Sequence, residues 1–439
     1  MTIEAEPQPV RPGLAGRWWF RPAFFMLLPV TMSFLAWMGL VGWREFGERT
    51  SSWAKLSGFA EPSTTSASGI VLLVVWYAAA VSVATIGWRL GTDKKLDPAT
   101  VERISSPNFE KRYFLLVLAA ALVGVLYSYY KIGSSQSILD SLTTQSNQFT
   151  TSLPGYAGIQ TLRSATILAA PVGIYLWRKK VIGFHLMALS VLLLVLNAAI
   201  ASRLSLFMAA FVFVTIMVVS RVPSKRVRLN RGRRWMTLIV IGAVGFGVLT
   251  GLNYIRNANY YRDAGVANPF EMNLYQMGAY LATPAQVSLG VAEAVMSGSW
   301  EQTGHRIDSI NAAQPTFLQF TKVSKEDGLR EGAFYGYSVV LESNFTTNSV
   351  FADTYAIYGM WGWVYAILLY SVAGYLFARL VRYGVVVAGS AGVMAYALSE
   401  IWRTQIVNYG FVIFLLLLTW ACAVAALLWC RVDERAAPF

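Results

Sequence analysis

The stretch YGFVIFLLLLTWACAVAALLW, residues 409–429, decides the fold class of this 439-residue chain. It contains no charged side chain, and its length matches the roughly 20 apolar residues that a membrane-spanning helix needs. Similar runs recur along the sequence, which is 56% hydrophobic and only 13% charged, with a mean hydropathy of +0.48. A soluble domain carries about 25% charged residues. The sequence therefore predicts an all-α polytopic membrane protein.

Ten apolar runs are long enough to be spanning helices. We predict spans over residues 23–42, 69–89, 113–130, 158–177, 181–200, 204–220, 236–254, 357–378, 385–401 and 409–429. The chain then divides into an N-terminus (1–22), spans one to seven (23–254), a long polar connection (255–350), spans eight to ten (351–430) and a tail (431–439).

Basic residues set the orientation of these spans, because Lys and Arg collect in the cytoplasmic loops of membrane proteins. Arg11, Arg17 and Arg21 precede the first span, and alternate connections carry most of the other basic clusters. The densest cluster, residues 221–234, serves either as an anchor or as a binding site for acidic lipid head groups. We expect both termini in the cytoplasm and residues 255–350 outside. Since the loops explain the net charge of +13, we expect no nucleic acid partner.

Residue types that bind metals are scarce. Cys422 and Cys430 fall at the last apolar run, too far apart along one helix to form a disulfide bond. His185 lies within a span, which leaves His305 as the histidine of the polar connection. We therefore expect no metal site and no cofactor. The first apolar run is longer than that of a signal peptide and lacks a cleavage site, so we expect it to be retained.

The polar connection, residues 255–350, is the most unusual segment, since a plain loop rarely holds so many ionisable groups. We expect it to form a partly helical cap over the spans. Residues 272–296 are apolar but contain Pro284 near their middle. We predict two short helices here that lie on or dip into the membrane, the second capped by Thr283 with Pro284 at its first position.

Cations and groups able to transfer protons gather on the expected outer side. Arg203 lies in the tight turn after span five, where it either binds a phosphate or only reaches the head groups. The polar connection adds Arg256, Arg262, His305, Arg306 and Asp308. Arginine binds diphosphate oxygens and stabilises a departing diphosphate, while His or a carboxylate accepts the proton of a sugar hydroxyl. This combination favours the transfer of a sugar from a diphosphate.

Three short motifs resemble those of a known family. They are Ala201-Ser202-Arg203-Leu204, Tyr280 with Pro284, and the segment from Asn344 through Phe351-Ala352-Asp353-Thr354-Tyr355-Ala356-Ile357-Tyr358-Gly359-Met360-Trp361-Gly362. With the span count and the late outer loop, residues 110–430 resemble the oligosaccharide repeat unit polymerases, the Wzy-type O-antigen and exopolysaccharide polymerases. The chain departs from the family at Ile357-Tyr358, where relatives often carry an acidic residue beside the aromatic residue.

The resemblance implies an activity. Family members transfer a growing glycan from undecaprenyl diphosphate onto the next lipid-linked repeat unit, at the outer face of the bacterial inner membrane. They use neither a metal nor a nucleotide sugar. The expected partners are the undecaprenyl-diphosphate-linked oligosaccharide, membrane lipids and, in the cell, a chain-length regulator and a flippase.

The resemblance also suggests roles for individual residues. The expected substrate-binding residues are Arg203, Arg256, Arg262, Arg306, Asp308 and Tyr355, and the candidate general bases are His305 and Asp353. His305, Arg306 and Asp308 match by location rather than by motif, and His305 is alternatively a surface histidine without a catalytic role. Asp353 is equally well read as a cap at the start of span eight. Glu400 and Arg403 lie on one helical face and form either a pair that holds the outer rim or a substrate contact. Arg163 either reaches the head groups or joins the phosphate site.

Alternative functions stay open. A ligase of the same superfamily would pass the finished glycan to a lipid core or a protein. A transporter or lipid-linked oligosaccharide flippase would need ionisable residues or broken helices near mid-membrane, whereas the charged residues of this sequence avoid the centres of the spans. A scaffold would tolerate changes at the outer arginines.

Overall fold

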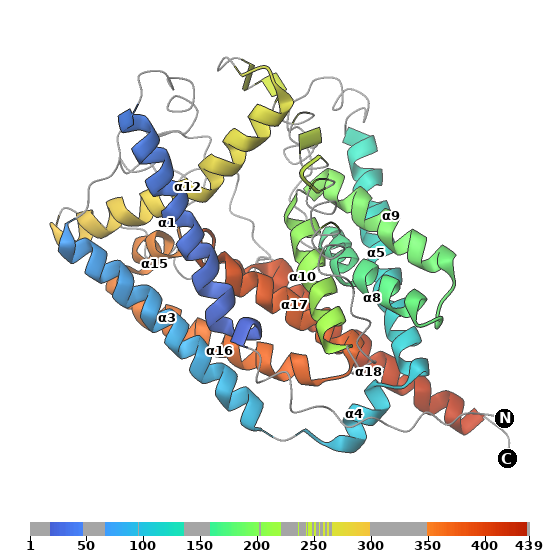
Figure 1. The fold of residues 1–439 in the computed structure, drawn as a ribbon. Coiled ribbons are helices and arrows are strands. Elements are labelled where there is room, and N and C mark those ends of the chain that lie inside the picture. The colour runs from blue at the N-terminus through green and yellow to red at the C-terminus, as the bar shows by residue number, and fades with distance from the viewer. Residues whose placement is uncertain are drawn as a thin grey trace.

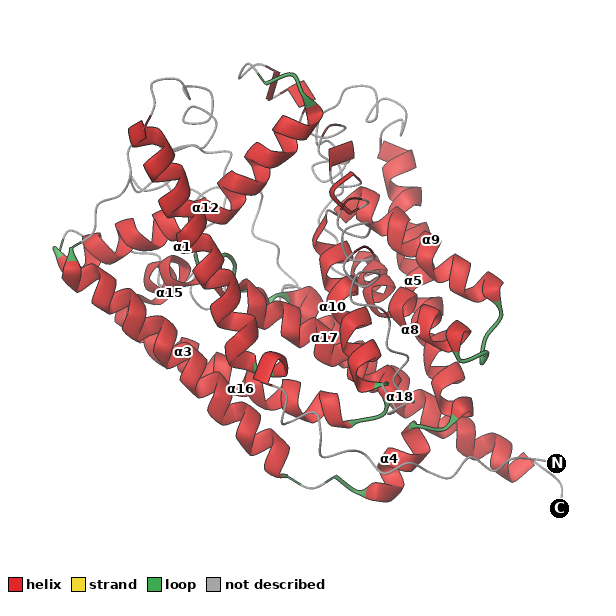
Figure 2. Ribbon diagram, in the orientation of Figure 1, coloured by secondary structure: helices red, strands yellow, loops and turns green. Residues whose placement is uncertain are grey.

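The computed structural model describes residues 18–46, 66–94, 96–135, 159–201, 203–220, 266–298 and 349–436, with isolated positions between 236 and 262. Every regular element within these residues is a helix, and they contain no strand (Figures 1 and 2). The predicted all-α class is confirmed.

The helices follow one another along the chain with short connections wherever both neighbours are described. In order they are η1 (Trp18–Phe20), α1 (Pro22–Phe46), α3 (Ala67–Asp93), α4 (Pro98–Ile104), α5 (Pro107–Ser135), η3 (Ile159–Ala165), α8 (Thr166–Arg178), α9 (Phe184–Ala201), α10 (Arg203–Val219), α12 (Pro269–Met296), α15 (Val350–Tyr358), η4 (Gly359–Trp361), α16 (Gly362–Arg382), α17 (Val385–Ser399), η5 (Glu400–Trp402), η6 (Ile406–Asn408) and α18 (Gly410–Ala436), where η marks a 3₁₀ helix.

Six helices of the described part are long and apolar enough to cross a membrane. They are α1, α3, α5, α16 together with η4, α17 together with η5, and α18, and they match predicted spans one, two, three, eight, nine and ten. Large apolar side chains on them stay exposed, such as Leu35 at 57%, Val74 at 61% and Trp420 at 68%. Such a surface suits lipid rather than water, which makes this a membrane-embedded protein.

Predicted spans four to seven are less complete. Span four is a 3₁₀ helix, η3, followed by the 13-residue α8. Helices α9 and α10 have 18 and 17 residues. At 1.5 Å per residue they rise about 26 Å, a little less than the roughly 30 Å of a bilayer core. Span seven, residues 236–254, is described only at isolated positions, so ten crossings stay a prediction.

The expected break at Pro284 is wrong. Residues 269–296 form one continuous helix, α12, with Pro284 inside it, so Thr283 caps nothing. The ribbon changes direction near the middle of α12 (Figure 1), as expected where proline removes a backbone hydrogen bond. Ser33 of α1 donates to the carbonyl of Leu281 at 2.6 Å, in the turn that Pro284 interrupts. Packing against α1 thus stabilises a distorted helix that sequence alone suggested would end.

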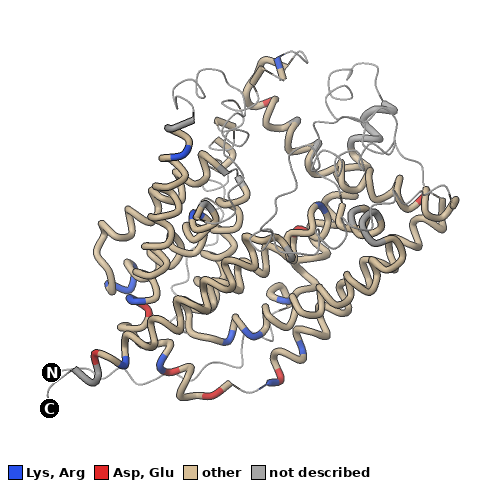
Figure 3. The backbone as a smooth tube through the Cα atoms, turned by 180° about the vertical axis from the view of Figure 1, so that it is seen from behind, with Lys and Arg blue, Asp and Glu red and all other residues tan. Residues whose placement is uncertain are grey.

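Most of the charged residues that the structure describes lie toward one end of the helix bundle (Figure 3). We call this the basic end, defined by the connections 93–107, 178–184 and 382–385. Helix α1 begins there, because Phe20 lies 5.5 Å from Phe377 near the end of α16. Helix α18 ends there, because Arg112 near the start of α5 forms an ion pair with Asp433. That arrangement fits an even number of crossings.

Small residues let the spanning helices approach closely. Gly87 and Gly91 of α3 meet α16 near Tyr375, and Gly374 of α16 meets the backbone of Ala84. A Cβ atom on any of these three glycines would collide with the neighbouring helix. The spacing of Gly87 and Gly91 is the small-xxx-small pattern of membrane helix pairs. Helices α3 and α16 therefore run side by side and parallel (Figure 1).

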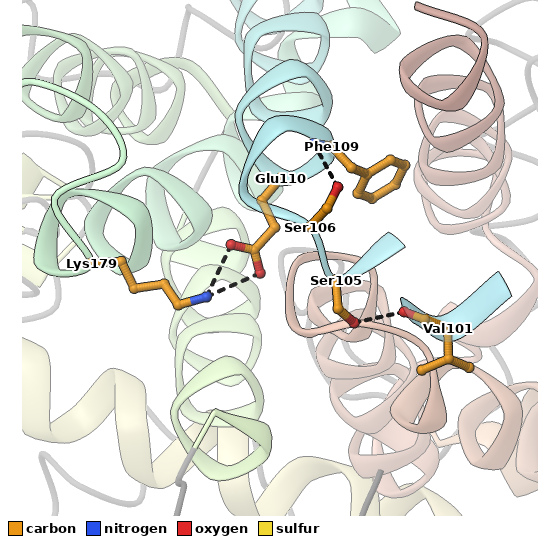
Figure 4. Close-up of polar contacts among 6 residues, drawn as sticks. All are labelled: Val101, Ser105, Ser106, Phe109, Glu110 and Lys179. Atoms are coloured by element: carbon orange, nitrogen blue, oxygen red, sulfur yellow. Dashed lines mark hydrogen bonds and ion pairs between the residues drawn. The ribbon is translucent and has the colours of Figure 1, made fainter. Parts of the chain in front are cut away.

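Polar contacts fasten the helices at the basic end. Arg382 of α16 donates to the carbonyls of Gly91, Thr92 and Lys94 at 3.3, 2.6 and 2.6 Å, which caps the C-terminus of α3. Figure 4 shows a second polar contact, an ion pair in which Lys179 donates to both carboxylate oxygens of Glu110 at 3.3 and 3.1 Å. Glu110 is 1% exposed, so this contact ties the α8–α9 turn to the start of α5.

Candidate functional site opposite the basic end

The connection between α17 and α18 holds a buried ion pair. Helix α17 tightens into η5, where the carbonyl of Glu400 accepts the backbone N–H groups of both Arg403 and Thr404 at 2.9 Å. Arg403 Nε donates to Glu400 Oε2 at 2.8 Å, and the two side chains are only 18% and 8% exposed. The predicted pairing of these two residues is confirmed. Whether the pair also contacts a substrate stays a prediction.

Aromatic side chains surround this pair. The Arg403 guanidinium lies 5.7 Å from the ring centres of both Tyr280 of α12 and Trp402. The Tyr396 hydroxyl lies near the Glu400 carboxylate. Burial disfavours the charged guanidinium, but the neighbouring carboxylate outweighs it and the pKa of Arg403 is raised. The site thus holds a permanent cation, partly sheltered from water and flanked by two aromatic rings.

Helix α12 brings further polar groups to this end of the bundle. Asn273, Gln276 and Tyr280 are spaced three and four residues apart, so they share one face of the helix. Asn273 and Gln276 are 0% and 9% exposed, and their side-chain oxygens have no hydrogen-bond partner among the described residues. Gln405, two residues after Arg403, is 6% exposed, and its side-chain nitrogen likewise lacks a described partner.

A second polar group lies near the start of α8. Asn197 of α9 donates to Thr166 Oγ1 at 2.9 Å, and Thr166 donates to the carbonyl of Arg163. Nη1 of Arg163 is buried without a partner among the described residues. A Cβ on Gly124 would collide with the backbone of Arg163, so α5 and η3 are in close contact. Arg163 therefore turns part of its guanidinium into the protein and does not merely extend to the head groups.

Several predicted site residues lie outside the described part of the chain. These are Arg256, His305, Arg306 and Asp308. Arg203 is the first residue of α10, but its side chain is not among those described. The same holds for the side chain of Asp353, which stands inside α15. Their predicted roles stay predictions.

The alternative role of Asp353 as a helix cap is wrong. The N-cap of α15 is Ser349, whose hydroxyl accepts the N–H of Ala352 at 3.0 Å. Helix α16 begins only at Gly362, nine residues after Asp353 in the sequence. The span therefore starts later than the apolar run suggests, because the lead into it forms a separate short helix.

Arg262 and Tyr355 are the predicted substrate-binding residues whose side chains are described. Arg262 is exposed, lies 5.2 Å from the ring centre of Tyr254 and donates to its hydroxyl. Tyr355 is 2% exposed. Its hydroxyl accepts a hydrogen bond from Trp363 Nε1 at 2.6 Å. A substrate could reach Arg262 directly, whereas contact with the buried Tyr355 requires a neighbouring side chain to move.

The described residues offer no metal centre, since no three of their His, Cys, Asp or Glu side chains are placed to hold an ion. What the sequence reasoning missed is the amide face of α12 with Gln405. A helical spacing of Asn273, Gln276 and Tyr280 within an apolar run was the signal that could have revealed it. Comparisons with protein families, curated proteins and solved structures found no match to this chain.

Proposed function

We propose that this protein is a membrane glycosyltransferase that polymerises lipid-linked glycan repeat units. The observation that carries the proposal is Arg403, whose charge is maintained by Glu400 next to the rings of Tyr280 and Trp402. An arginine in such a setting binds phosphate oxygens, and aromatic rings offer faces on which sugars stack. The sequence resemblance to repeat unit polymerases supports the same activity.

The proposed reaction transfers a glycan between two lipid carriers. A hydroxyl oxygen of the acceptor repeat unit forms a bond to the anomeric carbon of the donor glycan as the bond from that carbon to undecaprenyl diphosphate breaks. The hydroxyl proton goes to His305 or Asp353, and arginines neutralise the departing diphosphate. Arg403 joins Arg203, Arg256 and Arg262 as a candidate for the second task.

The position of the ionisable residues favours an enzyme over a transporter. Glu400 is the only Asp or Glu of the candidate span Val385–Trp402, and it lies at the end of that span rather than at its centre. A transport pathway more often places such groups near mid-membrane. A ligase shares the proposed donor and differs only in the acceptor, so the product must decide between ligase and polymerase.

The test compares glycan length on a gel. The membranes come from a strain that lacks its own copy of this protein, accumulates lipid-linked repeat units and is supplied with either wild type or a variant. Wild type should produce a ladder of polymer. Arg403→Met should reduce polymer about 100-fold, the effect of removing a positioned charge that stabilises a transition state. Exposed Arg89 at the basic end provides a control, since Arg89→Met should leave the ladder unchanged.

A second variant separates catalysis from folding. Arg403→Met leaves the buried Glu400 carboxylate without its counterion, which destabilises the fold. The double variant Glu400→Gln, Arg403→Met removes both charges and should restore the amount of protein in the membrane. If that double variant also restores a normal ladder, Arg403 has no role in the reaction. Transfer of single repeat units to a different acceptor would point to a ligase, and absence of any transfer by wild type would refute the proposed activity.

A further inference from the structure

The amide groups near Arg403 present an unusual pattern. The side-chain oxygens of Asn273 and Gln276 and the side-chain nitrogen of Gln405 are all buried without a hydrogen-bond partner among the described residues. Each residue is at least nine-tenths buried. Native proteins leave few such groups unpaired, because an unsatisfied buried amide is unfavourable. Two of them lie on α12, and the third is two residues after Arg403, which contacts Tyr280 of the same helix. This clustering of unpaired amides points to a ligand.

The chemistry of these groups indicates what kind of ligand fits. Two free acceptors and one free donor suit hydroxyl groups, each of which both donates and accepts a hydrogen bond. An anion can only accept hydrogen bonds, so the oxygens of Asn273 and Gln276 would repel it. Arg403 lies next to Tyr280, one helical turn from Gln276. The amide face therefore suits the uncharged part of a molecule whose charged part reaches Arg403.

Met277 lies beside Asn273 on α12. Asn273 Nδ2 donates a hydrogen bond to the Met277 sulfur at 3.9 Å. Met277 is 40% exposed, and methionine is the most flexible of the large apolar side chains. A change of its rotamer would release Asn273 Nδ2 from this contact without any movement of the helix backbone.

We infer that Asn273, Gln276 and Gln405, beside Tyr280, form a subsite that binds the hydroxyl groups of an uncharged glycan next to Arg403. The inference rests on the proposed function for the identity of the substrate, and it adds the residues that recognise the sugar rather than the diphosphate. Tyr280 supplies an aromatic face at the edge of the subsite, and the amides select for hydroxyls. This glycan-binding face belongs to a helix that the resemblance alone did not assign to any sugar.

The test measures binding and stability together. The purified protein in detergent is applied to an array of neutral oligosaccharides, with inorganic pyrophosphate as a charged comparison probe. Gln276→Met and Asn273→Leu replace the unpaired amides by apolar side chains of similar volume. Each variant should weaken oligosaccharide binding about tenfold and leave pyrophosphate binding unchanged. Each should also raise the thermal unfolding temperature, because an apolar side chain does not carry the desolvation cost of an unpaired buried amide. Leu274→Ala, at an exposed position on another face of α12, is the control.

The outcomes separate this inference from the proposed function, because binding does not require turnover. Loss of oligosaccharide binding with a gain in stability supports the subsite, even if no polymer is ever formed by the wild type. Unchanged binding in the variants overturns the subsite, even if the protein is a polymerase. Failure of the wild type to bind any oligosaccharide also overturns it. A lower unfolding temperature in both variants would show that the amides already have partners, and would overturn it as well.

Discussion

Replacing Lys179 by Met should destabilise the protein in a manner that depends on pH. Lys179 contacts both oxygens of the Glu110 carboxylate at 3.3 and 3.1 Å, and Glu110 is 1% exposed whereas the lysine side chain is 43% exposed. The variant therefore removes the accessible partner and leaves the inaccessible charge. Such removal from a fully buried pair costs about 3–5 kcal/mol.

The magnitude for this pair is smaller, for two reasons. The hydroxyl of Tyr175 lies near Glu110 and favours its charged form, and Glu110 lies in the first turn of α5, where the helix dipole favours a negative charge. Protonation of the carboxyl sets an upper limit, about 3.7 kcal/mol at pH 7, because each pH unit above the ordinary glutamate pKa of about 4.3 costs about 1.36 kcal/mol. We expect a loss of about 2–3 kcal/mol at pH 7.

The pH dependence has a definite sign. In the variant the Glu110 carboxyl takes up a proton in the folded state and releases it in the unfolded state, so the destabilisation shrinks as pH falls. Its upper limit is about 1.6 kcal/mol at pH 5.5. Unfolding by SDS in mixed dodecyl maltoside micelles, followed by circular dichroism at both pH values, measures it. Adding Glu110→Gln to Lys179→Met should recover most of the stability. A double variant as unstable as the single one, or a loss that is the same at both pH values, would refute the reasoning.

Two further changes test the packing of the helices. Gly374→Leu should lower the free energy of unfolding by about 1–3 kcal/mol, because its side chain would collide with the backbone of Ala84. The control is Gly39→Ala, which has open space around its Cα and should show no loss in the same SDS titration. Trp37→Phe should cost about 1–3 kcal/mol, since it removes the donor to the buried Gln286 oxygen, and Gln286→Met in that background should recover the loss. An unchanged midpoint for Gly374→Leu or for Trp37→Phe would contradict these assignments.

The most uniform apolar runs were predictable from sequence, and the interrupted ones were not. The predicted span 69–89 falls within helix Ala67–Asp93, and the span 409–429 coincides with helix Gly410–Ala436 from Gly410 onward, because a long apolar run has no other stable state in lipid. The run around Pro284 was misread as two helices. Its continuity depends on Ser33 and the packing of α1, residues about 250 positions earlier, which no local pattern reports.

The candidate site divides in the same way. Glu400 and Arg403 could be paired from their spacing, since helical geometry alone places residues three apart on one face. That Arg403 lies over the ring of Tyr280 follows only from how α12 crosses the bundle. The burial of Gln405 likewise depends on tertiary packing. The roles of Arg203, Arg256, Arg262, His305, Arg306 and Asp308 stay predictions from sequence.

The sequence by itself determined that this chain is helical and membrane-embedded, and it predicted that basic residues concentrate in alternate connections. These properties depend on the composition of each segment and on its exchange between water and lipid, which are local quantities. Only the tertiary structure decided which helices touch, that Pro284 bends a helix without ending it, and which buried amides lack a partner. Those outcomes depend on contacts between residues far apart in the chain, since a hydrogen bond or a close helix crossing exists only once both partners are in position.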